Sequence, residues 1–322
     1  MDYRRIRGTD LDVSTVCFGP MRSAGADDSD PRSAKGRAAL SAALDAGINF
    51  VHSSYEYGVR WMMNEVLRDH PKRHDIHHVI KVPVPDWDDE GRFDPDKVRG
   101  MIDEALRDLA ADRIALVQWM WRTRPHEDGP RQETLAAIRD DVGETFGRLR
   151  DEGKIGYVGV FPYTSASARA AIDTGNFTSV IAYYNPLEME MAELFGAMDQ
   201  REMSLLAIRP LYQGVLTDSR PSWEALPAGD RLKAEKHKDL FRHRAGMAEA
   251  LADAIEAEGS MTRFAMRFPL YAEAVASIIV GLNTPEQVHQ VVEQTDNVPY
   301  KPDVVARALS YWQQSIDGGS SG

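Results

Sequence analysis

The sequence contains a single cysteine, Cys17, among 322 residues. One cysteine excludes a disulfide within the chain and argues against a metal site built from cysteine ligands. No apolar run reaches the length of about 18 residues that a membrane-spanning helix needs. The first residues also lack the apolar region of a signal peptide. These absences predict a cytoplasmic location and no membrane partner.

Positive charge is in the minority, with 38 Lys and Arg against 50 Asp and Glu and a net charge of -12. Such an excess of negative charge argues against a nucleic-acid-binding surface. Its simplest explanation is solubility through self-repulsion. We therefore expect no nucleic-acid partner, and the charge indicates no particular oligomeric state.

No low-complexity linker divides the chain, so a single domain is expected at residues 1–317, followed by a flexible Gly/Ser tail at 318–322. Short β-branched runs alternate with longer amphipathic stretches, which is typical of βα units around a parallel sheet. Strands are predicted at residues 13–19, 48–54, 78–84, 114–120, 155–161, 180–185, 205–210 and 275–281, and helices at 38–46, 94–109, 133–151, 190–200 and 244–258. Eight units predict an α/β fold closed into a (β/α)8 TIM barrel.

Helix-end signals support this pattern. Asp94 precedes a proline, and Thr284 does the same with Gln287 placed to close a capping box. The glycines expected to end four helices are Gly47, Gly153, Gly175 and Gly259. A long polar loop is predicted after the seventh strand, at residues 216–243. It is either an active-site lid or a mobile surface loop.

Catalytic groups of such barrels lie at the C-terminal ends of the strands. Tyr57 follows the second predicted strand, and Lys81 lies within the otherwise apolar third strand. A lysine there must face the barrel mouth or be paired, because an unpaired buried ammonium is costly. A Tyr–Lys pair can serve as a general acid, although each residue alone is a weak signal.

Five segments of the chain resemble segments of the aldo-keto reductases and occur in the family's order. They are YR…VS…FGPM between 3 and 21, GINF…YG between 47 and 58, GKIGYVGV at 153–160, RPLYQGVL at 209–216 and IVGLNTPEQ at 279–287. The resemblance extends from end to end. It implies an N-terminal β-hairpin followed by a barrel whose tyrosine donates a proton to a carbonyl while a nicotinamide delivers hydride.

The resemblance also assigns the catalytic positions. Tyr57 and Lys81 match the family's tyrosine and lysine, whereas His52 stands at the aspartate position and Met120 at the histidine position. Methionine is a poor hydrogen-bond partner for a carbonyl, and histidine supplies no fixed negative charge. His52 could act as an acid/base group, or it could simply be packed and hydrogen-bonded.

By the same resemblance, the chain keeps part of an NADP(H) or NAD(H) site. Phe161, Pro162 and Ile181 replace the residues that usually grip the nicotinamide carboxamide, so the preference between NAD and NADP stays open. The residues expected to bind the cofactor are Tyr184, as the ring that stacks on nicotinamide, and Arg209, Leu211, Gln213, Gly281 and Asn283 around its phosphates, with Gln287 near the adenine.

A substrate pocket is predicted where aromatic and basic residues follow the third and fourth strands. These residues are Trp87, Trp121, Arg122 and Arg124. Aromatic walls suit a small molecule, and the arginines could clamp a carboxylate or phosphate, so a small, anionic substrate is one candidate. Because strand residues alternate, Trp119 is expected to point away from Met120 and into the core.

Three functions are compatible with these residues. The first is an NAD(P)H-dependent oxidoreductase that reduces a small carbonyl or conjugated alkene, with Tyr57 as proton donor. The second is a redox-silent lyase, dehydratase or isomerase that uses Tyr57, Lys81 and His52 as acid and base. The third is a non-catalytic binding subunit. No metal site is predicted, because the cluster of His74, His77 and His78 has no convergent carboxylate or cysteine.

Overall fold

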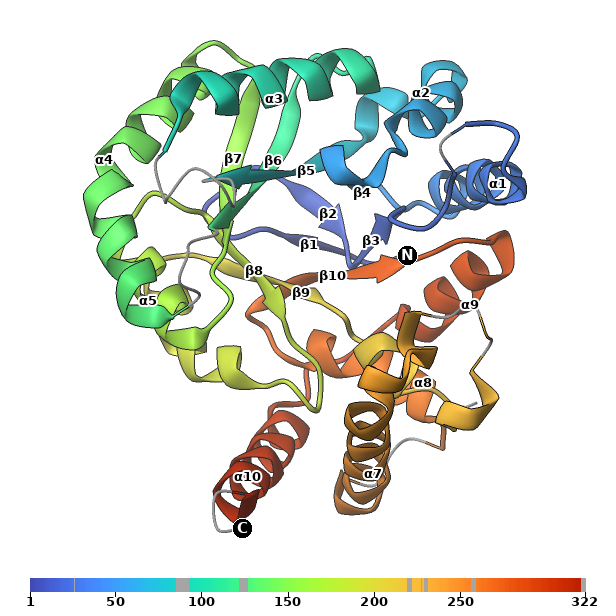
Figure 1. The fold of residues 1–322 in the computed structure, drawn as a ribbon. Coiled ribbons are helices and arrows are strands. Elements are labelled where there is room, and N and C mark those ends of the chain that lie inside the picture. Colours follow the sequence, from blue (N-terminus) through green and yellow to red (C-terminus); the bar gives the residue numbers. More distant parts are fainter. Residues whose placement is uncertain are drawn as a thin grey trace.

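Eight parallel strands form a closed barrel in the computed structural model, in the order β10-β3-β4-β5-β6-β7-β8-β9 (Figure 1). The structure describes residues 1–25, 27–84, 93–121, 127–218, 222–226, 228, 231–255 and 259–319. The barrel strands are β3 (Val16–Gly19), β4 (Phe50–Ser54), β5 (His77–Val84), β6 (Ile114–Trp121), β7 (Ile155–Phe161), β8 (Ser179–Tyr183), β9 (Ser204–Ile208) and β10 (Val275–Gly281). The predicted (β/α)8 barrel is confirmed.

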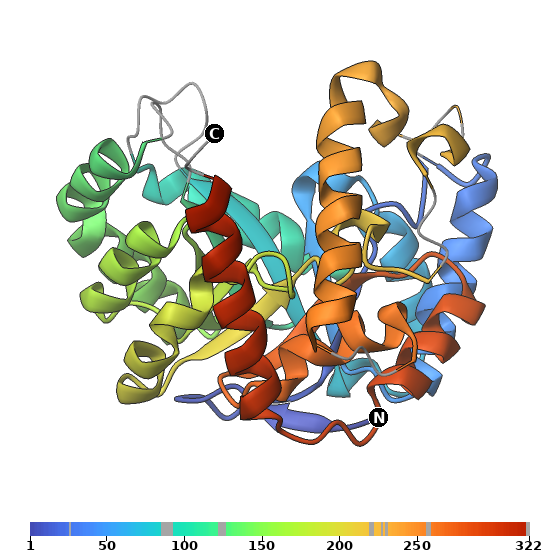
Figure 2. The same cartoon turned by 90° about the horizontal axis from the view of Figure 1, so that it is seen from below.

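An antiparallel hairpin of β1 (Tyr3–Arg5) and β2 (Asp12–Ser14) lies at one end of the barrel, at the bottom of Figure 2. The prediction of one strand over residues 13–19 was wrong, because the chain leaves the hairpin before it enters β3. The backbone N–H of Thr15, between the two strands, donates to the carbonyl of Asp2 at 2.9 Å. Side chains of the hairpin pack against the lower barrel interior and close that end.

Helices surround the barrel and mostly alternate with its strands (Figure 1). They are α1 (Pro31–Asp45), α2 (Arg60–Asp69), α3 (Pro95–Leu109), α4 (Asp128–Asp151), α5 (Ser165–Thr174), α6 (Phe195–Gln200), α7 (Lys238–Ile255), α8 (Met261–Arg267), α9 (Pro285–Thr295) and α10 (Pro302–Gly319). The expected N-caps are confirmed, since the side chains of Asp94 and Thr284 accept backbone N–H groups of α3 and α9. Among the described residues, no helix is long and apolar enough to cross a membrane.

Several helices begin earlier than their apolar periodicity predicts. Helix α1 begins at Pro31 instead of residue 38, and α4 and α7 start five and six residues before the predicted positions. The first turns of these helices are polar, so periodicity does not reveal them. In α1, the turn is fixed by the side chain of Asp30, which accepts the backbone N–H of Arg32 at 2.8 Å.

The long connection after β9 is present. Its described residues form short 3-10 turns, η4 (Tyr212–Gly214), η5 (Trp223–Ala225), η6 (Arg231–Lys233) and η7 (Glu235–His237), before α7 begins. Figure 2 shows α7 rising beyond the barrel at the end opposite the hairpin. Helix α10 packs beside α7 and continues to Gly319, two residues into the segment expected as a tail.

Candidate active site

Three of the four predicted catalytic side chains come together where β4 ends, beside Lys81 on β5. Strand β4 leads into η1 (Tyr55–Tyr57), a turn that ends at Gly58 in the left-handed conformation with a φ of 62°. Lys81 is in register with the last residue of β4, which brings its Nζ to 5.8 Å from the ring centroid of Tyr57. The ring centroid of His52 also lies 5.8 Å from that of Tyr57.

Glu56 is a site residue that the sequence reasoning missed. Its Oε2 lies 2.6 Å from Nζ of Lys81, and the two side chains are 32% and 12% exposed. A carboxylate at this distance favours the charged form of the lysine. The available signal was position alone, because Glu56 directly precedes Tyr57 in the turn.

His52 points into the barrel interior and is 5% exposed. Its Nε2 lies 2.8 Å from Oε1 of Gln118, whose own Nε2 donates to the sulfur of Met120 at 3.3 Å. Burial lowers the pKa of His52 to about 4, the nearby ammonium of Lys81 lowers it as well, and the bond to Gln118 acts in the opposite direction. Of the two interpretations of His52, the geometry matches the packed, hydrogen-bonded and neutral one.

The neutral state of His52 makes folding stability depend on pH. Its pKa is about 4 in the folded chain against an ordinary value of 6.5. Between these values the unfolded chain binds more protons, so the free energy of unfolding falls as the pH drops through this window, by up to about 1.4 kcal/mol per pH unit.

We expect His52→Gln to remove this dependence. Urea unfolding should show that the loss of stability from pH 7 to pH 5 is smaller in the variant, by about 2 kcal/mol. The matched control is His289→Gln, on the exposed face of α9. An equal pH dependence in His52→Gln and the unchanged chain would contradict a buried neutral imidazole.

Two predicted ligand contacts were wrong, because both side chains point away from the barrel interior. Tyr184 is fully buried, with ring centroids 5.4 Å from Phe195 and 5.9 Å from Phe268. Trp121 is also fully buried and stacks on Trp119 at 6.2 Å. Strand β6 continues through Trp121, so the alternation that correctly places Trp119 in the core places Trp121 there too.

Tyr183 faces the barrel mouth and shares a face with Ile181. The guanidinium of Arg209 lies 3.8 Å from its ring centroid, and Phe161 meets the ring edge-on at 5.4 Å. Phe161 also contacts Tyr163 at 4.8 Å. An aromatic wall therefore stands where the resemblance expects groups that bind the carboxamide.

The loop after β9 carries a run of left-handed residues. Arg209, Tyr212 and Gln213 have φ values of 63°, 46° and 60°. Arg244, from α7, donates to Oε1 of Gln213 at 3.0 Å and lies over the ring of Tyr212. Among the described residues, the Nε atoms of Arg209 and Arg244 are buried and have no hydrogen-bond partner. Arg209 also pairs with Glu188, and its side chain is 22% exposed. The two half-buried guanidiniums, each with one unpaired Nε donor, are candidates for the phosphates of a dinucleotide. Leu211, in the same loop, is half-buried.

The predicted adenosine-phosphate segment lies at the end of β10. Gly281 is exposed, and a Cβ added there would meet nothing within 4 Å. The carboxamide of Gln287 accepts the backbone N–H of Asn283 at 2.8 Å, so this glutamine braces the start of α9. Ser23, from the loop after β3, donates to the carbonyl of Leu282 at 2.8 Å and joins the two loops.

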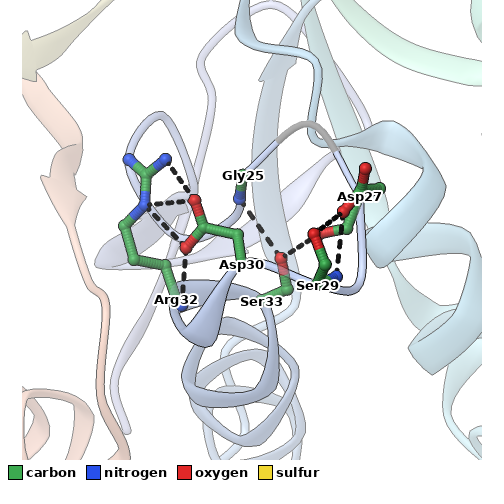
Figure 3. A network of polar contacts seen from close by, with 6 residues as sticks. All are labelled: Gly25, Asp27, Ser29, Asp30, Arg32 and Ser33. Atoms are coloured by element: carbon green, nitrogen blue, oxygen red, sulfur yellow. Dashed lines mark hydrogen bonds and ion pairs between the residues drawn. The ribbon is translucent and has the colours of Figure 1, made fainter.

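A polar network holds the loop after β3 to the first turn of α1 (Figure 3). The Oγ of Ser33 accepts the backbone N–H of Gly25 at 3.2 Å and donates to the carbonyl of Asp27 at 2.8 Å. Asp30 caps the helix and pairs with Arg32. These contacts fix the loop after β3, whose Ser23 is hydrogen-bonded to the segment that carries Asn283.

Three further residues predicted for the substrate pocket are not among those that the structure describes. Trp87, Arg122 and Arg124 lie outside the described residues. Within the described part of the chain, no group of three or more His, Cys, Asp or Glu side chains could hold a metal ion.

A cavity of about 480 Å³ opens at the opposite end of the barrel, near the hairpin. Its lining includes Asp10, His74, His77 and Arg113, and it contains neither Tyr57 nor Lys81. Chemistry in these barrels takes place at the C-terminal ends of the strands. We therefore assign the candidate active site to the cluster around Tyr57 and Lys81.

Comparison with known proteins gives the family of this barrel. The model of the aldo/keto reductase family matches residues 15–312. The chain belongs to that family. Aldo/keto reductases are oxidoreductases that generally use NAD(P)H, so the chain is an oxidoreductase of this type.

Relatives of this aldo/keto reductase carry several names. It is 25% identical to the "Uncharacterized oxidoreductase YqkF" of Bacillus subtilis, over 98% of each chain. It is 23% identical to L-galactose dehydrogenase of Arabidopsis thaliana, over 91% of this chain and 87% of the relative. Among solved structures, it matches an aldo-keto reductase from Bacillus halodurans in its holo form, with a TM-score of 0.72, 21% identity and 96% of each chain covered.

Proposed function

We propose that this aldo/keto reductase uses NAD(P)H to reduce a small carbonyl or conjugated-alkene substrate, with Tyr57 as the proton donor. The observation that carries the proposal is the convergence of Tyr57, Lys81 and Glu56 at the C-terminal end of the barrel. We further propose a small-molecule substrate and a cytoplasmic location for the enzyme.

The chain's own residues would deliver a proton. A nicotinamide, when bound, supplies the hydride of the reduction. The hydroxyl of Tyr57 gives its proton to the substrate oxygen, or to a carbon of an activated alkene. The ammonium of Lys81, 5.8 Å from the ring centroid, stabilises the negative charge left on the phenolate. Met120 contributes no strong hydrogen bond to the substrate, so orientation depends on the surrounding walls.

The two ends of the cofactor would be bound by different kinds of contact. Arg209, which also pairs with Glu188, and Arg244 supply positive charge for its phosphates. At the nicotinamide end, Phe161 and Tyr183 form an aromatic wall, and Ile181 is fully buried in the barrel interior. We infer that the nicotinamide ring is held mainly by packing against this wall, with the phosphates fixing its depth.

The redox-silent alternative requires His52 to exchange protons near neutral pH. Burial instead lowers the pKa of His52 to about 4, and its Nε2 is engaged by Gln118. This arrangement favours the oxidoreductase over an acid/base pair that includes His52.

Cofactor titration tests the proposal. We expect NADPH or NADH to quench tryptophan fluorescence saturably and to give matching calorimetric heats, with dissociation constants in the micromolar range. Turnover of a carbonyl or enone panel should then require the reduced cofactor. Well-folded protein that binds neither nucleotide, or that consumes substrate without one, would overturn the proposal.

A further inference from the structure

The lysine of this site has a carboxylate partner, although the strand position beside it holds a histidine. Nζ of Lys81 is 2.6 Å from Oε2 of Glu56, whereas His52 is buried, neutral and turned to Gln118. We propose that Glu56, on the turn after β4, takes the place of the aspartate expected at position 52 and is the positioning residue that keeps Lys81 charged. This inference rests on the proposed role of Tyr57 as proton donor.

The two partners are held by different elements. Lys81 extends from the inner face of β5, in register with Ser54 on one side and Gln118 on the other. Glu56 is the middle residue of η1, whose start is capped by the Oγ of Ser54 at 3.4 Å from the N–H of Glu56. A glutamate side chain is one methylene longer than aspartate, which suits a carboxylate that reaches in from the turn.

The surroundings favour a strong pair. The lysine side chain is only 12% exposed, so solvent screens the ion pair less than it would at the surface. The titratable groups beside Lys81 include Glu56, Tyr57 and His52. His52 is uncharged at neutral pH, so it adds no charge to the cluster and cannot supply the missing carboxylate.

The pairing also orders the general acid. Glu56 and Tyr57 are adjacent in one turn, and Lys81 contacts the first through its ammonium and lies 5.8 Å from the ring of the second. Fixing Lys81 on Glu56 therefore fixes its distance from Tyr57.

Glu56→Gln tests the proposal without relying on turnover. Protein labelled with ¹³C at lysine Cε would be titrated by NMR, with Lys81→Met to assign the Lys81 resonance. We expect the titration midpoint of Lys81 to fall by about 1–3 pH units in Glu56→Gln. An unchanged midpoint would overturn the proposal. The matched control is Glu65→Gln, on α2, where Glu65 pairs with Arg37 at 3.1 Å and should leave Lys81 unaffected.

The second test asks whether a carboxylate at position 52, on β4, can replace the one removed from position 56. In the double variant His52→Asp/Glu56→Gln, the restored carboxylate should return the Lys81 midpoint toward its original value and recover part of kcat. If that variant folds and restores neither, position 52 and position 56 are not interchangeable and the proposal fails. If the double variant does not fold, Glu56→Asp takes its place. It keeps the charge on a shorter side chain, so its Lys81 midpoint should lie between those of Glu56→Gln and the unchanged chain, and a midpoint equal to that of Glu56→Gln would contradict the proposal.

The two proposals fail in different ways. If no reduction depends on NAD(P)H, the proposed function is wrong, yet the NMR titration still reports whether Glu56 controls Lys81. If reduction proceeds and Glu56→Gln changes neither the Lys81 midpoint nor kcat, only the role of Glu56 is wrong.

Discussion

Tyr57→Phe is expected to lower kcat by about 10²- to 10⁴-fold, the usual contribution of a positioned general acid. The change removes one oxygen and keeps the ring, which is half-buried and packs against the core. Because no cofactor contact is assigned to the hydroxyl, the dissociation constant for NAD(P)H should stay within about twofold. Steady-state kinetics and fluorescence titration of the same preparations check both values.

The control for this variant is Tyr300→Phe. Tyr300 is an exposed tyrosine in the loop between α9 and α10. Its change should leave kcat unaltered. Turnover by Tyr57→Phe at the rate of the unchanged enzyme would remove Tyr57 from the chemistry, whatever the cofactor titration shows.

Trp121→Ala is expected to destabilise the protein by about 3–5 kcal/mol, because it empties a fully buried site. Its ring stacks on Trp119, which in turn stacks on Phe177 at 5.5 Å, between the barrel and its helices. Urea unfolding measures the loss. Trp223→Ala, at the half-buried first residue of η5, is the matched control and should cost less.

The same variant separates a core role from a substrate-binding role. If enough folded protein remains at low temperature, KM should stay close to that of the unchanged enzyme. A large rise in KM without a loss of stability would instead return Trp121 to the substrate pocket.

The sequence was sufficient for the barrel because its signals are local. Eight apolar runs, helix caps such as Asp94 and Thr284, and glycines such as Gly47 each act within a few residues. Alternation along a strand is equally local. Applied consistently, it would have placed Tyr183 rather than Tyr184 at the mouth, and Trp121 in the core.

The contacts that define the site were harder to predict, because they join elements far apart in the chain. Glu56, after β4, contacts Lys81 on the neighbouring β5, 25 residues further along the chain, and Gln118 contacts His52 across 66 residues. Arg244 meets Gln213 only because α7 packs over the loop after β9. Matching positions to a family pattern marks which residue is missing, but it does not show which neighbour has replaced it.

Placing the carboxylate on η1 changes what must move for it to leave the lysine. A charge on a central strand such as β4 could withdraw only if the barrel opened, whereas Glu56 belongs to a three-residue turn that ends at Gly58. Short exposed turns open at much lower free energy than core strands. The protonation of Lys81, and with it the acid strength of the site, would then follow a local opening equilibrium. A ligand that covers this turn would oppose its opening, and it would therefore keep Lys81 charged for as long as it occupies the site.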